Sequence, residues 1–216
     1  MTATRPVPTV LTGRFIRIEP LTPALLPELH AAIGRPVVFA EGYGRGPEGY
    51  RERVEDFVPW AIDYYRWDQN PYLIRAVGGE LDGVALGTST MQDFDEEREH
   101  THIGHTAYDP RVWGTQVNAE AKLLLLGLAF DSGFGRVRIQ TDILNERSQA
   151  AIAGIGGVRE GVVRRDILRA DGSWRDTVVF SILVDEWPDV RAGLENRLAK
   201  WGDRPVEYRD RSSSSR

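Results

Sequence analysis

The segment from Thr101 to Thr141 limits the possible folds most, because strand and helix patterns alternate within it. Residues 101–108 alternate as a strand, 118–130 predict a helix that Ser132 and Gly133 end, and 136–141 are rich in β-branched residues. A helix that connects two strands packs against the sheet that contains them. We therefore expect a protein in which helices cover a β-sheet.

The rest of the chain adds strands before this segment and a strand pair after it. The patterns predict strands at 14–19, 72–77, 83–92, 158–168 and 176–184, helices at 24–33, 50–67 and 147–155, and a glycine-rich loop at 39–47. The order is a meander, then strand–helix–strand–helix, then a closing hairpin. This order predicts an α/β (α+β) fold with a mixed, mostly antiparallel sheet.

Composition excludes several classes of function. The chain has 216 residues, no cysteine, and 27 basic against 32 acidic residues, which gives a net charge of −5. Disulfides, cysteine-ligated metals and thiol catalysis are excluded, and the acidic balance argues against nucleic acid or an anionic membrane as the partner. Without a signal-like or membrane-spanning stretch, we expect a soluble cytoplasmic protein. Residues 209–216 are polar and are expected to form a mobile tail.

The loop between the strand at 101–108 and the helix at 118–130 is the first candidate site. Free amides at the start of a helix favour a bound anion such as a phosphate or pyrophosphate. Gly114 in this loop is equally compatible with an ordinary turn. The loop lacks the Gly-Lys-Ser/Thr of a Walker sequence and the glycine triplet of a dinucleotide-binding loop.

Five motifs in order resemble those of the GNAT acyltransferases, in particular the ribosomal-protein N-terminal acetyltransferases. They are Leu11-x-Gly13-Arg-x-Ile-Arg-Ile-Glu-Pro-Leu21, Ile103-Gly104, Arg111-x-x-Gly114-x-Gln116, Asn145-Glu-Arg-Ser148-x-x-Ala-Ile152, and Glu160-Gly161 with Asp171-Gly172-x-x-Arg175-Asp176. The resemblance implies a single GNAT domain over residues 10–188, with a C-terminal extension at 189–208. It also implies a sheet that splays between the strands ending near Tyr108 and Asp142.

The resemblance further implies that acetyl-CoA is the acyl donor, with its pantetheine arm in the splay and its pyrophosphate on the amides of Trp113 to Val117. The residues expected to bind it are Tyr108, Arg111, Val112, Trp113, Gly114, Thr115, Gln116, Val117, Asn118 and Asn145. Gln116 replaces the usual glycine or alanine of the family. Its side chain would either crowd the pyrophosphate or add a donor to it.

His102 and Ser148 are the expected catalytic residues. His102 stands where related proteins often have a glutamate that serves as base, and an imidazole with a pKa near ~6.5 suits that role. Ser148 matches the position that resemblance associates with protonation of the thiol. The alternatives are that His102 is a structural strand histidine and that Asn145 caps the helix containing Ser148.

Two further groups of residues have open interpretations. His100 and His102 could form a metal pair, joined by His105 if Gly104 makes a bulge, but no third ligand is evident and no metal is expected. Aromatic residues at 60–72 are expected mainly in the core. Phe39, Glu41 and Tyr43 are expected to line a pocket for the acceptor amine.

The function expected is transfer of acetyl from acetyl-CoA to a primary amine, a protein N-terminus or a small molecule, by direct attack in a ternary complex. The alternatives are a CoA-binding regulatory module without turnover and a histidine-based metal hydrolase. Whether the chain forms a homodimer stays open. The helix at 118–130 is expected to pack Leu123, Leu124 and Leu128 against the sheet.

Overall fold

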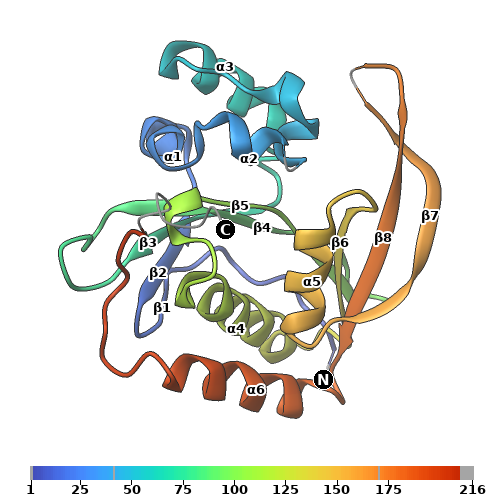
Figure 1. Cartoon of the computed structure of the whole chain (residues 1–216). Helices are drawn as coiled ribbons and strands as arrows, with labels where there is room; N and C mark the ends of the chain where they lie inside the picture. The colour runs from blue at the N-terminus through green and yellow to red at the C-terminus, as the bar shows by residue number, and fades with distance from the viewer. Residues whose placement is uncertain (1, 41, 170, 210–216) are drawn as a thin grey trace, which may run out of the picture.

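The computed structural model describes residues 2–40, 42–169 and 171–209, and its centre is an eight-stranded sheet (Figure 1). The strand order is β1-β2-β3-β4-β5-β6-β8-β7. The strands are β1 (Leu11–Thr12), β2 (Ile16–Pro20), β3 (Asn70–Ala76), β4 (Ala85–Asp95), β5 (His100–Tyr108), β6 (Arg136–Asp142), β7 (Val158–Leu168) and β8 (Trp174–Leu183). The mixed, mostly antiparallel sheet predicted from the sequence is confirmed.

A single parallel contact joins the two halves of this sheet. Residues 100–102 of β5 pair with residues 136–138 of β6, and every other neighbouring pair of strands is antiparallel. Beyond His102 and Arg138 the two strands no longer pair. The remainder of β5 therefore presents backbone amides and carbonyls along an open splay.

Helices cover both faces of the sheet, as Figure 1 shows. They are α1 (Leu26–Ile33), α2 (Pro36–Ala40), α3 (Val54–Tyr64), α4 (Gln116–Asp131), α5 (Glu146–Gly154) and α6 (Trp187–Ala199). The first three pack in one apolar core with Leu73 and Ala107, and α4 and α6 pack in a second core on the opposite face. None of the helices in the described part of the chain is both long and apolar enough to span a bilayer.

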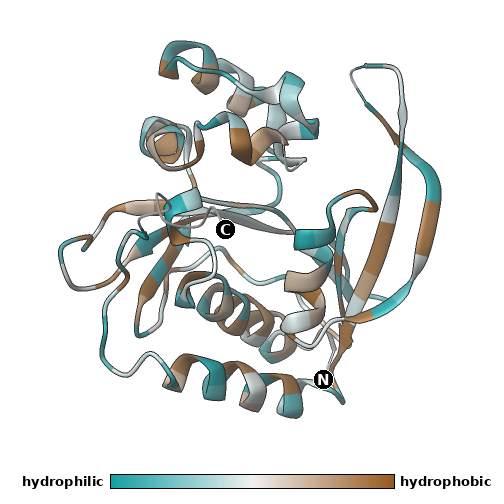
Figure 2. Ribbon diagram, in the orientation of Figure 1, coloured by the Kyte–Doolittle hydropathy of each residue, from teal (hydrophilic) through white to brown (hydrophobic). Residues whose placement is uncertain are grey.

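The expected packing face of α4 is wrong. Leu125 and Leu126 are fully buried, whereas Leu123, Leu124 and Leu128 are only partly buried. The cause is α6, which packs along α4 and was not expected as a helix. Because neighbours cover α4 on two sides, its apolar residues extend around it and do not form one stripe (Figure 2).

Several element boundaries also differ from the expectation. The glycine-rich loop at 39–47 instead contains the end of α2 and a 3₁₀ turn at Tyr43–Arg45. The helix expected at 50–67 is the shorter α3, with Pro59 inside it. A short strand, β1, precedes the expected first strand. These differences concern the ends of elements and short turns, which a hydrophobic pattern along the sequence defines poorly.

A buried carboxylate of α4 holds the first long strand in place. Glu120 is 3% exposed, and its two oxygens accept hydrogen bonds of 2.7 Å from the backbone amides of Arg14, Phe15 and Ile16. These amides lie at the start of β2, where no neighbouring strand accepts them. Glu120 thus satisfies three backbone donors that would otherwise be buried without partners.

The N-terminal residues are held at the far end of α4. The amide of Thr4 donates to the carbonyl of Ser132 at 2.9 Å, and Ala3 is buried against Gly133. Near the other end of α4, Arg14 pairs with Asp203 of the C-terminal segment at 2.9 Å. Both chain ends are therefore fastened around the same helix.

Candidate active site

The loop between β5 and α4 is stabilised by a fully buried aspartate. Asp109 accepts the backbone amide of Arg111 at 2.9 Å and its guanidinium at 2.6 Å. Arg111 also lies 3.6 Å from the centre of the Tyr208 ring. These contacts occupy the Arg111 side chain and stabilise the conformation of the loop. Arg111 could bind a phosphate only if it gave up its ion pair with Asp109.

The start of α4 differs from the expected start at Asn118. The helix begins at Gln116, and Thr115 is its N-cap, with its hydroxyl accepting from the Val117 amide at 3.4 Å. Gly114 immediately before the cap has a φ of 74°, which a β-branched residue would not tolerate. The left-handed turn at Gly114 directs the chain from the loop into the helix.

Not all of the amides expected to face an anion are free. Trp113 and Thr115 already donate to the carbonyls of Pro110 and Val112, each at 3.3 Å. The amides of Gly114 and Gln116 have no acceptor among the residues that the structure describes. An anion at this helix start would therefore be bound mainly by these two amides, with the helix dipole behind them.

Gln116 does not extend from the loop into solvent. The residue is 1% exposed, and its side-chain amide donates to the carbonyl of Arg204 at 3.3 Å. Its function in this structure is to bind the C-terminal segment to the start of α4. Glutamine at position 116, where related proteins have glycine or alanine, is therefore explained by its hydrogen bond to the Arg204 carbonyl outside the loop.

Asn145 and Ser148 lie at the start of α5, which follows the end of β6. The side-chain oxygen of Asn145 accepts the Ser148 amide at 2.8 Å, so the alternative interpretation, that Asn145 caps this helix, is confirmed. Ser148 is partly exposed, in the first turn of α5. On the β5 side, the Tyr108 hydroxyl donates to Asn118 of α4 at 3.1 Å.

His102 lies at the base of the splay, since it is in the last β5–β6 pair. Its Nδ1 is 3.3 Å from Asp93 Oδ2, and the side-chain amide of Gln92 lies 3.1 Å from the same nitrogen. Nδ1 therefore faces one acceptor, the Asp93 carboxylate, and two donors, the Gln92 amide and the Arg138 guanidinium at 3.5 Å. The bond to Asp93 forms in the tautomer that carries its proton on Nδ1 and its lone pair on Nε2. Nε2 is buried beside Gly104 and has no partner among the described residues.

The charges around His102 have opposing effects on its pKa. Burial lowers the pKa of the imidazole, the hydrogen bond to Asp93 raises it, and the nearby Arg138 guanidinium lowers it. The same hydrogen bond to His102, with Arg138 3.0 Å away, lowers the pKa of Asp93 to about 2. His102 is thus neutral at neutral pH, as a general base must be.

The remaining histidines of β5 do not join His102 in a metal centre. A bulge between Gly104 and Ala107 places His105 in a left-handed conformation, with φ 46°, and its ring lies 5.0 Å from that of Tyr64. Burial lowers the pKa of His105 to about 4. Within the ranges described, no group of three histidine, aspartate or glutamate side chains is placed to hold a metal ion.

The predicted acceptor residues lie mainly in the aromatic core. Phe39 is fully buried, with its ring 5.4 Å from Tyr43 and 5.8 Å from Trp60, and the Tyr43 hydroxyl bonds that of Tyr65 at 2.6 Å. Phe39 therefore has no surface to offer a substrate in this structure, because packing against Trp60 covers it. Glu41 lies outside the described residues.

The hairpin of β7 and β8 rises beside α2 and α3 and adds polar groups that the sequence analysis did not select (Figure 1). Asp142 at the end of β6 forms an ion pair with Arg169, and the half-buried Arg175 of β8 lies near Tyr64 and Asp142. Burial lowers the pKa of Arg175. Carboxylates and aromatic rings thus meet on the α3 side of the sheet, opposite α4.

Lys122 was also missed, although a lysine between Ala121 and Leu123 in an apolar helix is an unusual feature. The residue is 4% exposed, and Nζ donates to Thr106 Oγ1 at 3.1 Å. No carboxylate among the described residues forms an ion pair with it. Burial lowers the pKa of its amine to about 7.

We expect Lys122 to make stability rise with pH. The unfolded chain binds the lysine proton more tightly than the folded chain between about pH 7 and 10.5, so unfolding becomes less favourable as pH rises through this window. The slope should reach at most about 1.4 kcal/mol per pH unit. Urea unfolding of Lys122→Met should lack this contribution, and the exposed Lys200→Met is the matched control. Equal slopes for the wild type and Lys122→Met would contradict the burial argument.

Comparison with known proteins agrees with this geometry. The acetyltransferase (GNAT) domain matches residues 16–158, and an acetyltransferase structure from T. thermophilus is 33% identical, covering 90% of this chain and 100% of that chain with a TM-score of 0.78. The matched residues span the loop between β5 and α4, the splay and α5. The chain belongs to the GNAT acetyltransferase family.

More distant structures share the fold. A GCN5-related N-acetyltransferase from Brucella melitensis is 24% identical, with a TM-score of 0.77, and covers 90% of this chain and 87% of its own. Mycobacterium smegmatis RimJ, solved in complex with CoA-disulfide, is 18% identical, with a TM-score of 0.63, and covers 87% of this chain and 93% of its own. Comparison with the curated proteins gives no match.

Proposed function

We propose that this protein transfers the acetyl group of acetyl-CoA to a primary amine, either a protein N-terminus or a small molecule. The observation that carries the proposal is the juxtaposition of the free Gly114 and Gln116 amides with the open edge of β5. The amides suit the pyrophosphate of the donor, and the strand edge suits the amides of its pantetheine arm. The RimJ structure with bound CoA-disulfide supports the same choice of donor.

His102 is the proposed base and Ser148 the proposed acid. The amine attacks the thioester carbonyl and forms the new C–N bond, and its proton passes to Nε2 of His102, directly or through one water. The C–S bond then breaks, and the leaving thiolate takes a proton from the Ser148 hydroxyl, which solvent reprotonates. The position of His102 at the base of the splay and of Ser148 in the first turn of α5, which follows β6, supports these roles.

The acceptor is proposed to enter from the α3 side of the sheet. There the Asp142 carboxylate lies at the end of β6, paired with Arg169, and the amine is proposed to pair with it in place of Arg169. A protein acceptor would be similar to the substrates of the ribosomal-protein N-terminal acetyltransferases. The protein is proposed to act in the cytoplasm, without nucleic acid or membrane.

Acetyl-CoA should stabilise the folded protein. At ~100 times its dissociation constant, the ligand is expected to add about 2.7 kcal/mol to the free energy of unfolding. Gly114→Val should abolish the shift in melting temperature, because φ is 74° and a Cβ would lie 3.1 Å from Arg209 Nη1. Gly78→Val, at an identical φ of 74° in the β3–β4 turn, is the matched control and should keep the shift.

Thiol release with a panel of amines tests the chemistry. Turnover with at least one primary amine is the expected result. Tight binding of acetyl-CoA without turnover across protein N-terminal peptides, polyamines and amino acids would instead favour a CoA-binding module. An unshifted melting temperature at millimolar acetyl-CoA, with calorimetry also silent, would contradict the proposal.

A further inference from the structure

Polar side chains of β6 and β8 gather on one face of the sheet, where β6 ends. Asp142 of β6 pairs in register with Thr177 of β8, and Arg175 lies two residues before Thr177. Cross-strand partners and residues two apart on a strand share a face, so these three side chains lie on the same face. Val178, next to Thr177, packs in the core of α4 and α6. The three polar side chains therefore lie on the opposite face, which is the side of α3.

Two of these side chains have polar atoms without partners. The Nε of Arg175 and the Oγ1 of Thr177 are buried and make no hydrogen bond with any residue that the structure describes. Burial lowers the pKa of Arg175, and the nearby carboxylates of Asp142 and Asp166 offset this only in part. A guanidinium that has lost water without gaining an acceptor is costly, so Arg175 favours an anion beside it.

The ion pair between Asp142 and Arg169 limits which amines suit this place. Arg169 is 23% exposed and Asp142 is 14% exposed, so neither charge is well hydrated. A simple cationic amine that replaced Arg169 at Asp142 would leave the Arg169 guanidinium without its carboxylate, near the unpaired Arg175. Like charges repel strongly in such a place, and breaking a buried pair leaves an uncompensated charge. The acceptor should therefore bring a negative charge together with its amine.

An acceptor with a carboxylate next to its amine meets this requirement. Its ammonium can pair with Asp142 while its carboxylate pairs with the guanidinium groups of Arg169 and Arg175. Every charge then keeps an opposite partner. A guanidinium binds both oxygens of a carboxylate in one plane, which makes the pairing selective for that group.

A further cation lies on the α3 side of the same place. Arg45, in a turn that precedes α3, is exposed and forms no ion pair within the described part of the chain. Burial raises the pKa of Tyr64 of α3, and the nearby guanidinium groups of Arg45 and Arg175 act in the opposite direction. The Tyr64 ring lies 5.0 Å from that of His105. The cations thus lie around an aromatic ring that reaches β5, the strand along the splay.

We propose that the acceptor is a free amino acid, whose carboxylate binds Arg169 and Arg175 and whose amine pairs with Asp142. The inference rests on the proposed function, since it takes the chain to transfer acetyl to an amine. The ammonium releases one proton to solvent, the neutral amine attacks the thioester, and a second proton passes to His102. The products are an N-acetyl amino acid and CoA. A protein N-terminus fits less well, because the carbonyl next to its amine belongs to an uncharged amide.

The test compares kcat/KM for acceptors that differ in the carboxylate. The panel contains the twenty amino acids, their carboxamides, and peptides that begin with aspartate or asparagine. At least one amino acid should exceed its carboxamide by about tenfold or more, because charge-assisted hydrogen bonds hold the carboxylate. A carboxylate raises the pKa of the neighbouring amine, so this preference cannot come from a larger share of neutral amine.

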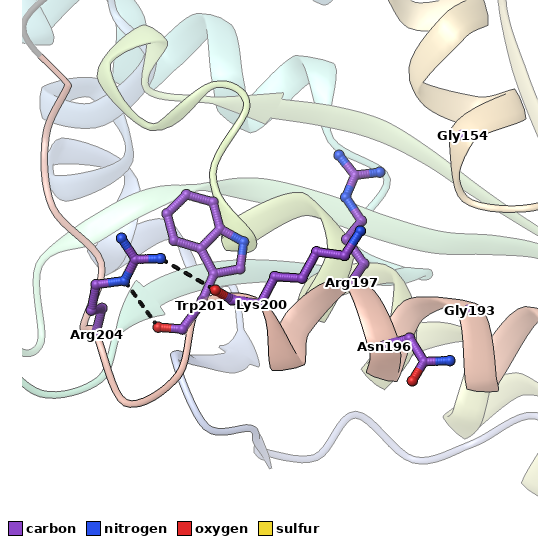
Figure 3. Close-up of a pocket in the computed structure, with 7 residues that line it drawn as sticks. All are labelled: Gly154, Gly193, Asn196, Arg197, Lys200, Trp201 and Arg204. Carbon is purple, nitrogen blue, oxygen red and sulfur yellow. Dashed lines mark hydrogen bonds between the residues drawn. The ribbon is translucent and has the colours of Figure 1, made fainter.

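Variants locate the source of the preference. Arg175→Gln should remove most of it through a higher KM for the amino acid, with kcat/KM for the carboxamide nearly unchanged. Arg175→Lys keeps the charge but loses the planar fork, and should fall between Arg175→Gln and the wild type. The matched control is Arg197→Gln, which removes a cation from the pocket between α5, α6 and the C-terminal segment (Figure 3) and should keep the preference. The melting temperature with acetyl-CoA checks that each variant is folded.

The outcomes separate this inference from the function on which it rests. Equal kcat/KM for each amino acid and its carboxamide, or turnover confined to amines without a carboxylate, would overturn the inference alone. A preference that Arg175→Gln retains would also overturn it, as would one seen only for peptides that begin with aspartate over those that begin with asparagine. The absence of turnover with every amine would overturn the inference and the proposed function together.

Discussion

Replacing His102 with alanine is expected to lower kcat by ~10²–10⁴-fold, with the affinity for acetyl-CoA nearly unchanged. The reason is geometric. In the tautomer that bonds Asp93 through its Nδ1 proton, the buried Nε2 carries a lone pair at the base of the splay. His102 contacts neither Gly114 nor Gln116 of the anion loop. Steady-state kinetics with a saturating amine, together with calorimetry of acetyl-CoA, measures both quantities.

The pH profile distinguishes a base from a structural histidine. Burial holds the pKa of His102 below its ordinary value of 6.5, so log(kcat/KM) should rise with pH through that lowered pKa and then level off. His102→Ala should lose this limb and retain the limb that belongs to the free amine. His100→Ala, at the first residue of β5, is the matched control and should keep both limbs. A His102→Ala rate within about threefold of wild type would mean that the histidine is structural.

Replacing Glu120 with alanine is expected to destabilise the fold by more than about 3 kcal/mol, because two buried amides and one partly buried amide each lose an acceptor. Glu120→Gln keeps one acceptor oxygen and should fall between alanine and wild type. Urea unfolding measures the free energies. Glu195→Ala removes an exposed carboxylate of α6 and should cost about 0.5 kcal/mol or less. A loss below about 1 kcal/mol for Glu120→Ala would show that water satisfies the amides.

The sequence predicted the architecture because hydrophobic periodicity and turn residues are local signals. All strands of the sheet except β1, the long helix after the loop and the splay between β5 and β6 were expected. The packing face of α4 was not, because it depends on α6. The sequence of α6 carries only a weak amphipathic pattern and begins with Trp187 and Pro188, so its partner helix could not be inferred.

The position of the loop between β5 and α4 could be predicted from the sequence, but the contacts of its side chains could not. The position of the loop between β5 and α4 follows from the order of strands and helices, which can be predicted from the sequence. The partners of the side chains do not follow from element order. Asp109 binds the Arg111 guanidinium, and Gln116 donates to a carbonyl 88 residues further along the chain. Lys122 was missed because burial of a charged residue is decided by tertiary packing and not by its neighbours in sequence.

The fastening of the N-terminus to the far end of α4 has a consequence for synthesis. A ribosome releases the chain from its first residue onward, yet the Thr4 amide finds its acceptor only after Ser132 has emerged. Until then the apolar sides of β2, β3 and β4 lack α4 as cover. Contacts between residues so far apart in the sequence slow folding and prolong the exposure of apolar, aggregation-prone surface. The apolar faces of these strands are therefore expected to stay uncovered during synthesis until α4 has emerged.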